Sequence, residues 1–135
     1  MVNPNGESDP LRELMVDGAE IDRRAITSAL KGRVGIDSGS GRLVLLSGFN
    51  ELDARRKLLA LLLAQKAALL LEVAETETLT NGAATKASGL ASGTVAPSLR
   101  SLKELRLVEQ DAARAYYVAD VQVGSAISFI NGGLP

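Results

Sequence analysis

Residues 80–118 read TNGAATKASGLASGTVAPSLRSLKELRLVEQDAARAYYV, and the elements expected within them indicate the architecture of the chain. Thr80 is expected to cap a short helix over residues 81–87, because a threonine hydroxyl can accept a hydrogen bond from a free N–H group of the first helical turn. Gly89 then supplies a turn, since glycine adopts left-handed backbone conformations without steric cost. A second helix is predicted to follow and to end near Leu105.

This second predicted helix has one apolar face. Ser92 or Thr94 can provide its N-cap, and apolar side chains then recur at the i, i+4, i+7 spacing of a helix that packs on a core. These side chains are Val95, Leu99 and Leu102. Pro97 lies early in the helix, which is acceptable if the helix begins at Thr94, because first-turn N–H groups have no partner within the helix.

Two short strands are predicted after the helix, over residues 107–110 and 115–118, with residues 111–114 as the turn between them. Before the helix pair, a long run of helix formers covers residues 51–73. A long helix, a helix–turn–helix and a hairpin, in that order, make up a winged helix-turn-helix. The predicted fold class is therefore mainly α with small β-hairpins, a winged helix-turn-helix with an N-terminal extension of helices and a hairpin.

The segments ATKASGLASGTV (residues 84–95) and SLRSLKELRLV (residues 98–108) resemble the winged-helix superfamily of bacterial and archaeal transcription regulators. Its members share a glycine in the turn, a buried Val or Ile six residues later, a Leu-x-x-Leu pattern, a Leu-Val strand and a wing that ends in an aromatic residue. The matching residues are Gly89, Val95, Leu99, Leu102, Leu107, Val108, Tyr116 and Tyr117. The resemblance covers about residues 51–118 and implies a DNA-binding fold that is commonly homodimeric.

Two residues depart from the pattern of the superfamily. Thr85 stands where members usually have an Ala that faces the crossing helix, so we expect slightly looser packing between the helices. Arg106 stands where they usually have the glycine that ends the second helix. A left-handed conformation is therefore expected at a non-glycine residue, at a cost of about 1 kcal/mol.

In a winged helix the second helix enters the major groove of DNA, so the resemblance implies contacts from helix 93–105 and from the wing, residues 107–118. Hydroxyl groups there suit phosphate oxygens or base edges, and Arg and Lys suit phosphates or guanine. The candidate DNA-binding residues are Lys86, Ser92, Thr94, Ser98, Arg100, Ser101, Lys103 and Arg114. Residues 80–118 carry five basic and three acidic side chains, a net charge of +2 against −1 for the whole chain.

Composition excludes several kinds of site. The 135 residues include no Cys and no His, which excludes disulfides, zinc sites built from nitrogen and sulfur ligands, and catalysis by a histidine base or a thiolate. We therefore expect no enzyme, no cofactor and no metal. Because the chain is not basic overall, DNA contact must depend on a local patch. The alternative is a winged helix that contacts protein, an assembly module without DNA binding.

Four segments are predicted along the chain. They are a disordered lead (1–10), N-terminal helices and a β-hairpin (11–48), the winged helix-turn-helix (49–120), and a C-terminal apolar segment and tail (121–135). Gly18 is expected to separate two short helices, and the hairpin to pair residues 32–36 with 42–46. A faint similarity between residues 30–44 and 102–117 leaves open a degenerate second winged unit.

The long helix predicted over residues 51–73 has apolar side chains around nearly its whole circumference. Such a helix is either the centre of a domain or shared with a partner subunit. Asn50 is the predicted N-cap, with Asp53 in a carboxylate variant of the capping box. The basic residues 55–57 are interpreted as a solvated first turn, and an acidic stretch is interpreted as a solvated helix end. Its carboxylates are Glu72, Glu75 and Glu77.

The apolar run 121–130 either pairs with a second chain, which gives a homodimer, or covers the N-terminal helices within the same chain. Residues 1–10 lack the basic and apolar parts of a secretory signal. Residues 58–74 are short for a membrane span and are interrupted by polar side chains, at Gln65, Lys66 and Glu72. We expect a cytoplasmic protein that binds double-stranded DNA and no membrane. If the apolar run pairs with a second chain, the protein is a homodimer.

Overall fold

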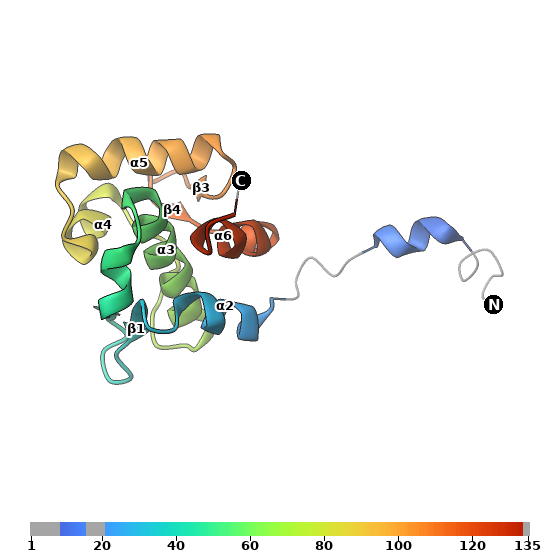
Figure 1. Ribbon diagram of the computed structural model, residues 1–135, viewed down its shortest axis with the longest axis horizontal. Helices are drawn as coiled ribbons and strands as arrows, with labels where there is room; N and C mark the ends of the chain where they lie inside the picture. The colour runs from blue at the N-terminus through green and yellow to red at the C-terminus, as the bar shows by residue number, and fades with distance from the viewer. Residues whose placement is uncertain (1–8, 16–20, 134–135) are drawn as a thin grey trace.

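The computed structural model describes residues 9–15 and 21–133 (Figure 1). Within this part the chain is mainly helical and has two small antiparallel hairpins, which confirms the predicted mainly-α class. The elements are η1 (Pro10–Leu14), α2 (Arg23–Leu30), β1 (Val34–Ile36), β2 (Leu43–Leu45), η2 (Ser47–Glu51), α3 (Ala54–Leu70), α4 (Asn81–Ser88), α5 (Ser92–Glu104), β3 (Glu109–Gln110), β4 (Tyr116–Tyr117), η3 (Asp120–Gln122) and α6 (Val123–Ile130).

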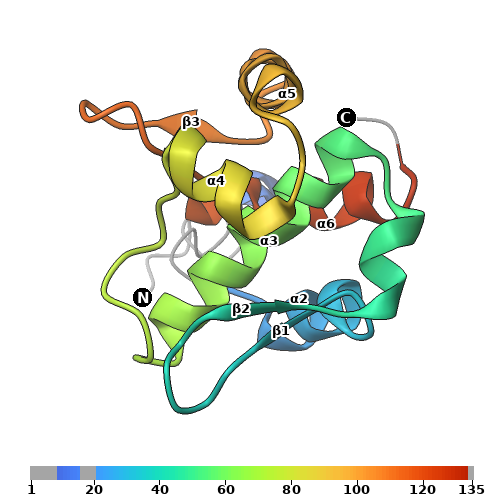
Figure 2. The ribbon, with the colours of Figure 1, turned by 90° about the vertical axis from the view of Figure 1, so that its left-hand side faces the viewer.

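Helix α3 is the central helix of the fold. It packs against α5, α6, α4, α2 and β1, so that neighbours from both ends of the chain surround it (Figures 1 and 2). Every residue from 58 to 64 is at most 1% exposed. The neighbours of α3 within one chain therefore cover its apolar circumference, and no partner subunit is needed to do so.

The start of α3 differs from the prediction. Asn50 is not the N-cap, because it lies in η2, and Leu52 follows it in an extended conformation that separates η2 from α3. The cap is Asp53, whose carboxylate accepts a hydrogen bond from the N–H of Arg56 at 3.0 Å and also pairs with the Arg56 guanidinium. The helix ends at Leu70 and not at residue 73.

Asp53→Ala is expected to lower the free energy of unfolding by about 1 kcal/mol, the usual cost of losing an N-cap. Asn50→Ala, the matched control, is expected to change it by less than about 0.5 kcal/mol.

Burial alone would raise the pKa of Asp53, but hydrogen bonds from Arg56 outweigh it and hold the pKa below its usual 3.8. The Asp53 contribution is therefore present above that pH and lost on acidification. Urea titrations of both variants at pH 7 and pH 3 measure these effects. If Asp53→Ala and Asn50→Ala lowered the free energy of unfolding equally at pH 7, the assignment of Asp53 as the cap would be contradicted.

The pair α4–α5 has most of the local features predicted for these two helices. The Thr80 hydroxyl accepts a hydrogen bond from the N–H of Ala83 at 3.1 Å, and Gly89 ends α4 with φ 72°. The three apolar residues predicted to face the core from α5 are all 0% exposed, namely Val95, Leu99 and Leu102. Arg106 has φ 62°, the left-handed conformation expected for it.

Three details of this pair were predicted wrongly. Neither Ser92 nor Thr94 caps α5, because the helix already begins at Ser92, after Ala91, without a side-chain cap. Pro97 consequently lies beyond the first turn, and the carbonyl left without its N–H belongs to Gly93, an exposed residue.

The third wrong detail concerns Thr85. It is only half-buried, and its hydroxyl donates to the Asn81 carbonyl at 2.8 Å. The buried residue at this point of α4 is Ala84, which is 1% exposed. The small side chain that packing needs is therefore present one position earlier, and no loosening follows from Thr85.

The hairpin β3–β4 forms as predicted, with shorter strands than expected. Glu109 pairs with Tyr117 and Gln110 with Tyr116. An additional bridge, which was not predicted, joins Leu79 to Tyr116 through two backbone hydrogen bonds of 2.8 and 2.9 Å. This bridge fixes the hairpin to the residues that precede α4.

The N-terminal part contains the second predicted hairpin, β1–β2, in which Gly35 pairs with Val44. The two predicted short helices are found as η1 and α2, whereas Gly18 between them, residues 1–8 of the lead and residues 134–135 of the tail lie outside the described residues. Residues 21–46 contain one α-helix before their hairpin, and not the helix pair that precedes β3–β4.

Helix α6 settles which surface the C-terminal apolar run covers. Val123, Ala126, Phe129 and Ile130 are at most 5% exposed. Helix α6 packs against α3 and α2. Within the single chain the run thus covers α2 and α3, in agreement with the second of the two alternatives. Val121 is the exposed large apolar residue of the run, at 80%.

Candidate nucleic-acid interface

A polar hollow of about 460 Å³ lies between α5, the start of α4 and the hairpin β3–β4. Figure 2 shows this hairpin projecting from the body beside α4 and α5. The hollow is lined by Asn81, Arg100, Lys103, Gln110, Arg114 and Tyr116. Three of these side chains are cationic and none is a carboxylate, so the lining is suited to an anion.

The helical contribution comes from one flank of α5. Arg100 and Lys103 are one turn apart, and both are exposed. The Lys103 ammonium donates a hydrogen bond of 3.2 Å to the Gln110 side chain on β3. This contact connects the flank of α5 to the hairpin, and both elements line the hollow.

The turn of the hairpin places the third cation. The Asp111 carboxylate accepts hydrogen bonds of 2.9 Å from the N–H groups of Ala113 and Ala115, which closes the turn. Arg114 is exposed and has φ 65°, a left-handed conformation that costs a non-glycine residue about 1 kcal/mol. The Gln110 amide donates to the Arg114 carbonyl at 3.3 Å and connects the turn to the hollow.

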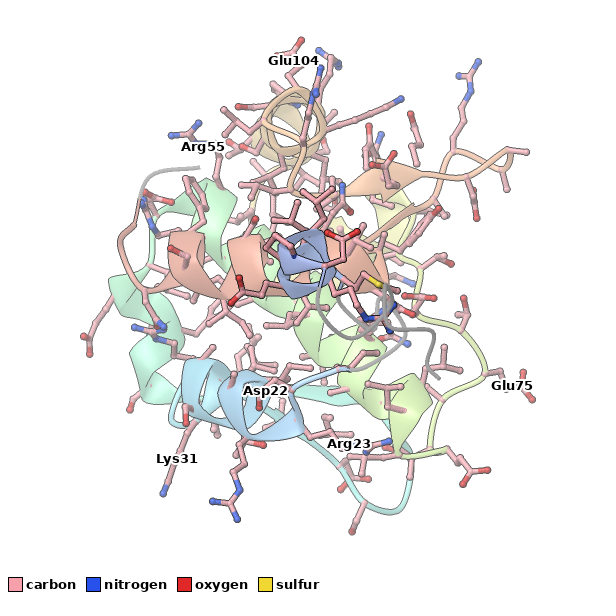
Figure 3. All side chains as sticks on the ribbon, turned by 90° about the vertical axis from the view of Figure 1, so that its right-hand side faces the viewer. Asp22, Arg23, Lys31, Arg55, Glu75 and Glu104 are labelled. Atoms are coloured by element: carbon pink, nitrogen blue, oxygen red, sulfur yellow. The ribbon has the colours of Figure 1, made fainter. Side chains whose placement is uncertain are left out.

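Four candidate residues of α5 do not line this hollow. Thr94, Ser98 and Ser101 are half-buried on the other flank of α5, and the Ser101 hydroxyl accepts a 3.3 Å hydrogen bond from Arg55 at the start of α3. Figure 3 shows Arg55 beside α5. Ser92 is exposed at the first turn of α5 but does not line the hollow.

Lys86 also lies apart from the other three cations. It lines a different hollow, of about 460 Å³, together with Arg42 of the N-terminal hairpin and Gln65 of α3. Of the eight candidate residues, the structure thus brings together Arg100, Lys103 and Arg114.

Sequence reasoning missed three lining residues, namely Asn81, Gln110 and Tyr116. Asn81 could have been found, because it is the first residue of the predicted α4 and the N-terminus of a helix favours anions. Gln110 and Tyr116 gave no such signal, since their place in the hollow depends on how the hairpin packs beside α5.

The basic residues at the start of α3 are held by the protein and are not a solvated turn. The Arg56 guanidinium lies 4.3 Å from the centroid of the Phe129 ring, and its Nε donates a 2.7 Å hydrogen bond to the Phe129 carbonyl. Arg55 lies over the same ring at 5.5 Å, and Lys57 lies over Phe49 at 5.6 Å. These three cations join α3 to its neighbours.

No family model, curated protein or solved structure matches the chain. Over residues 9–15 and 21–133, no acidic cluster has the composition and closeness needed to hold a metal ion. None of the helices in the same residues combines the length and the apolar character that a membrane span requires. The residues of the polar hollow therefore carry the functional inference.

Proposed function

We propose that residues 54–118 form a winged helix-turn-helix and that the chain binds duplex DNA as a small transcription regulator in the cytoplasm. The observation that carries the proposal is the hollow between α5 and β3–β4, in which Arg100, Lys103 and Arg114 are brought together without a carboxylate. Cations that converge from a helix flank and a hairpin turn suit the phosphates of a DNA backbone.

Two neutral side chains support binding in the same place. The Asn81 and Gln110 amides line the same hollow as the three cations and can donate to phosphate oxygens or to base edges. Asn81 is also the first residue of α4, where the free N–H groups and the helix dipole favour an anion.

Contacts to the backbone are expected to outweigh contacts to bases. The exposed face of α5 next to the hollow carries Gly93 and Pro97, which offer no side-chain hydrogen bond, and Glu104, whose carboxylate repels phosphates. Base recognition is then limited to long side chains at the edge of the hollow, chiefly Arg100 and Gln110. We therefore expect affinity that depends strongly on salt and modest preference for sequence.

Fluorescence anisotropy with random-sequence duplex DNA tests the proposal. For three neutralised phosphates, raising the salt concentration from about 50 to 200 mM should weaken wild-type binding about 40-fold. The variant Arg100→Ala/Lys103→Ala/Arg114→Ala should bind weakly at low salt and lose most of this salt dependence.

The double variant Arg24→Ala/Arg42→Ala provides the control. It removes positive charge from two exposed positions outside the hollow and should bind DNA nearly as the wild type does. Absence of wild-type binding at low salt, or an equal loss of affinity in the control and in the triple variant, would overturn the proposal. An assembly module that contacts protein would then be the better hypothesis.

A further inference from the structure

An apolar groove lies at the end of the molecule opposite α5. Two hollows of about 250 and 430 Å³ adjoin there between α2, β1 and the end of α3. They share four lining residues, Ile26, Thr27, Ala67 and Leu71, and so form one groove, here called the α2–α3 groove. Figures 1 and 2 both place α2 and β1 on the far side of α3 from α5.

Large apolar side chains remain exposed at this groove. Leu71, which lines both hollows, is 57% exposed, and Leu46, which lines the larger one, is 39% exposed. Val44 is 44% exposed and lies with Leu46 against Gly35, on the same hairpin. A continuous apolar surface of this kind is typical of an interaction site.

The chain also carries an exposed apolar segment near its N-terminus. Residues 9–15, here called the arm, contain η1, and none of its residues is buried. Leu11, Leu14 and Met15 are 65%, 75% and 69% exposed. Leu11 and Leu14 are three residues apart and so lie on the same side of this 3-10 turn, and Met15 follows the turn in an extended conformation.

The charges of the arm and of the groove are complementary. The arm carries two carboxylates, Asp9 and Glu13, and one cation, Arg12, so its net charge is −1. The groove is lined by Arg23 in one hollow and by Lys31 in the other. Figure 3 shows these two cations at opposite ends of α2. An arm seated along the groove would therefore place its acidic groups between two basic ones.

We propose that the arm of one copy of this chain packs in the α2–α3 groove of a second copy, and the reverse, to form a two-fold symmetric dimer. In the single chain the arm does not cover the groove, since Leu14 and Leu71 both remain more than half exposed. Reciprocal exchange uses both apolar surfaces of each copy and closes at two subunits. It also leaves α5 and β3–β4 of both copies free, because they lie at the other end of the molecule (Figure 1).

Sedimentation equilibrium of the full chain tests the dimer. Leu11→Glu/Leu14→Glu should weaken dimerisation by more than about 1,000-fold, because both arms change and the burial of four leucine side chains is lost. Leu71→Glu and Leu46→Glu in the groove should each weaken it as well, with circular dichroism to show that they fold. The matched control is Val121→Glu, which changes an equally exposed apolar residue outside both surfaces and should leave the dimer intact. A wild type that is monomeric at 100 µM, or a dimer that resists the arm and groove variants, would overturn the proposal.

Cysteine cross-linking distinguishes exchange from docking within one chain. The chain has no cysteine, so Leu14→Cys/Leu71→Cys introduces the only two thiols. Mild oxidation should give a covalent dimer on a non-reducing gel. A cross-linked monomer would show that the arm folds onto its own groove, and an absence of cross-links would show that the two surfaces do not meet, so either result overturns the proposal. The proposed dimer does not depend on DNA binding. Arg100→Ala/Lys103→Ala/Arg114→Ala should therefore remain dimeric.

Discussion

Glu77→Gln combined with Asp120→Asn is expected to lower the free energy of unfolding by about 3 to 5 kcal/mol, because the double change leaves a buried cation without its partners. The cation is Lys66 of α3, whose side chain is 3% exposed. Its ammonium lies 2.9 Å from Glu77 and 2.6 Å from Asp120. These contacts join α3 to the segment before α4 and to η3. Urea unfolding at pH 7 measures the loss.

A variant without the cation tests whether the loss comes from an unpaired buried charge or from a general loss of contacts. Lys66→Met in the wild type keeps most of the apolar stem, and its two former partners can regain water because they are 27% and 47% exposed. Lys66→Met is therefore expected to cost less than the double carboxylate change, and to recover much of the stability when it is added to that double variant. A double variant within about 1 kcal/mol of the wild type would show that Lys66 reaches solvent.

The same cluster predicts a loss of stability in alkaline solution. Burial alone would lower the pKa of Lys66, but hydrogen bonds and attraction from Asp120 and Glu77 outweigh it and raise the pKa above 10.5. A raised pKa in the folded chain stabilises it at all pH values below 10.5, and this stabilisation is lost as the pH rises through the folded-state pKa. Lys66→Met should lack this part of the alkaline loss.

Local patterns in the sequence were sufficient to predict α4, α5 and the turn between them. Gly89, the apolar spacing of α5 and the left-handed Arg106 each express a constraint that acts within a few residues. Lys66 could not be recognised in this way. Its partners lie 11 and 54 positions further along the chain, so in sequence it is only a polar interruption of an apolar helix.

In the candidate site, too, the sequence predicted what depends on neighbouring residues and missed what depends on distant contacts. The sequence placed Arg100 and Lys103 on one helix and Arg114 in the following turn, and these three do line one hollow. A helical pattern alone does not say which flank of α5 will be covered by the start of α3. The Arg55 guanidinium meets that flank at Ser101, where Thr94 and Ser98 are half-buried as well.

Phe129→Ala is expected to lower the free energy of unfolding by about 3 to 5 kcal/mol, the range for truncating a buried phenylalanine. Phe129 is 2% exposed on α6, and the Arg56 guanidinium lies 4.3 Å from its ring centroid. The truncation therefore leaves a cavity between α6 and α3 and also removes a cation–π contact, which adds about 0.5 to 1 kcal/mol. Urea unfolding followed by circular dichroism measures the loss.

Two further variants show whether the loss comes from packing of α6 within the chain. Phe129→Leu keeps an apolar side chain in the site and should cost less than Phe129→Ala. Val121→Ala, at an 80% exposed position next to the same helix, should change stability by less than about 0.5 kcal/mol. If Phe129→Ala were as mild as Val121→Ala, α6 would not be part of the folded core. The apolar run 121–130 would then need another surface to cover it, and the pairing with a second chain that its sequence first suggested would have to be reconsidered.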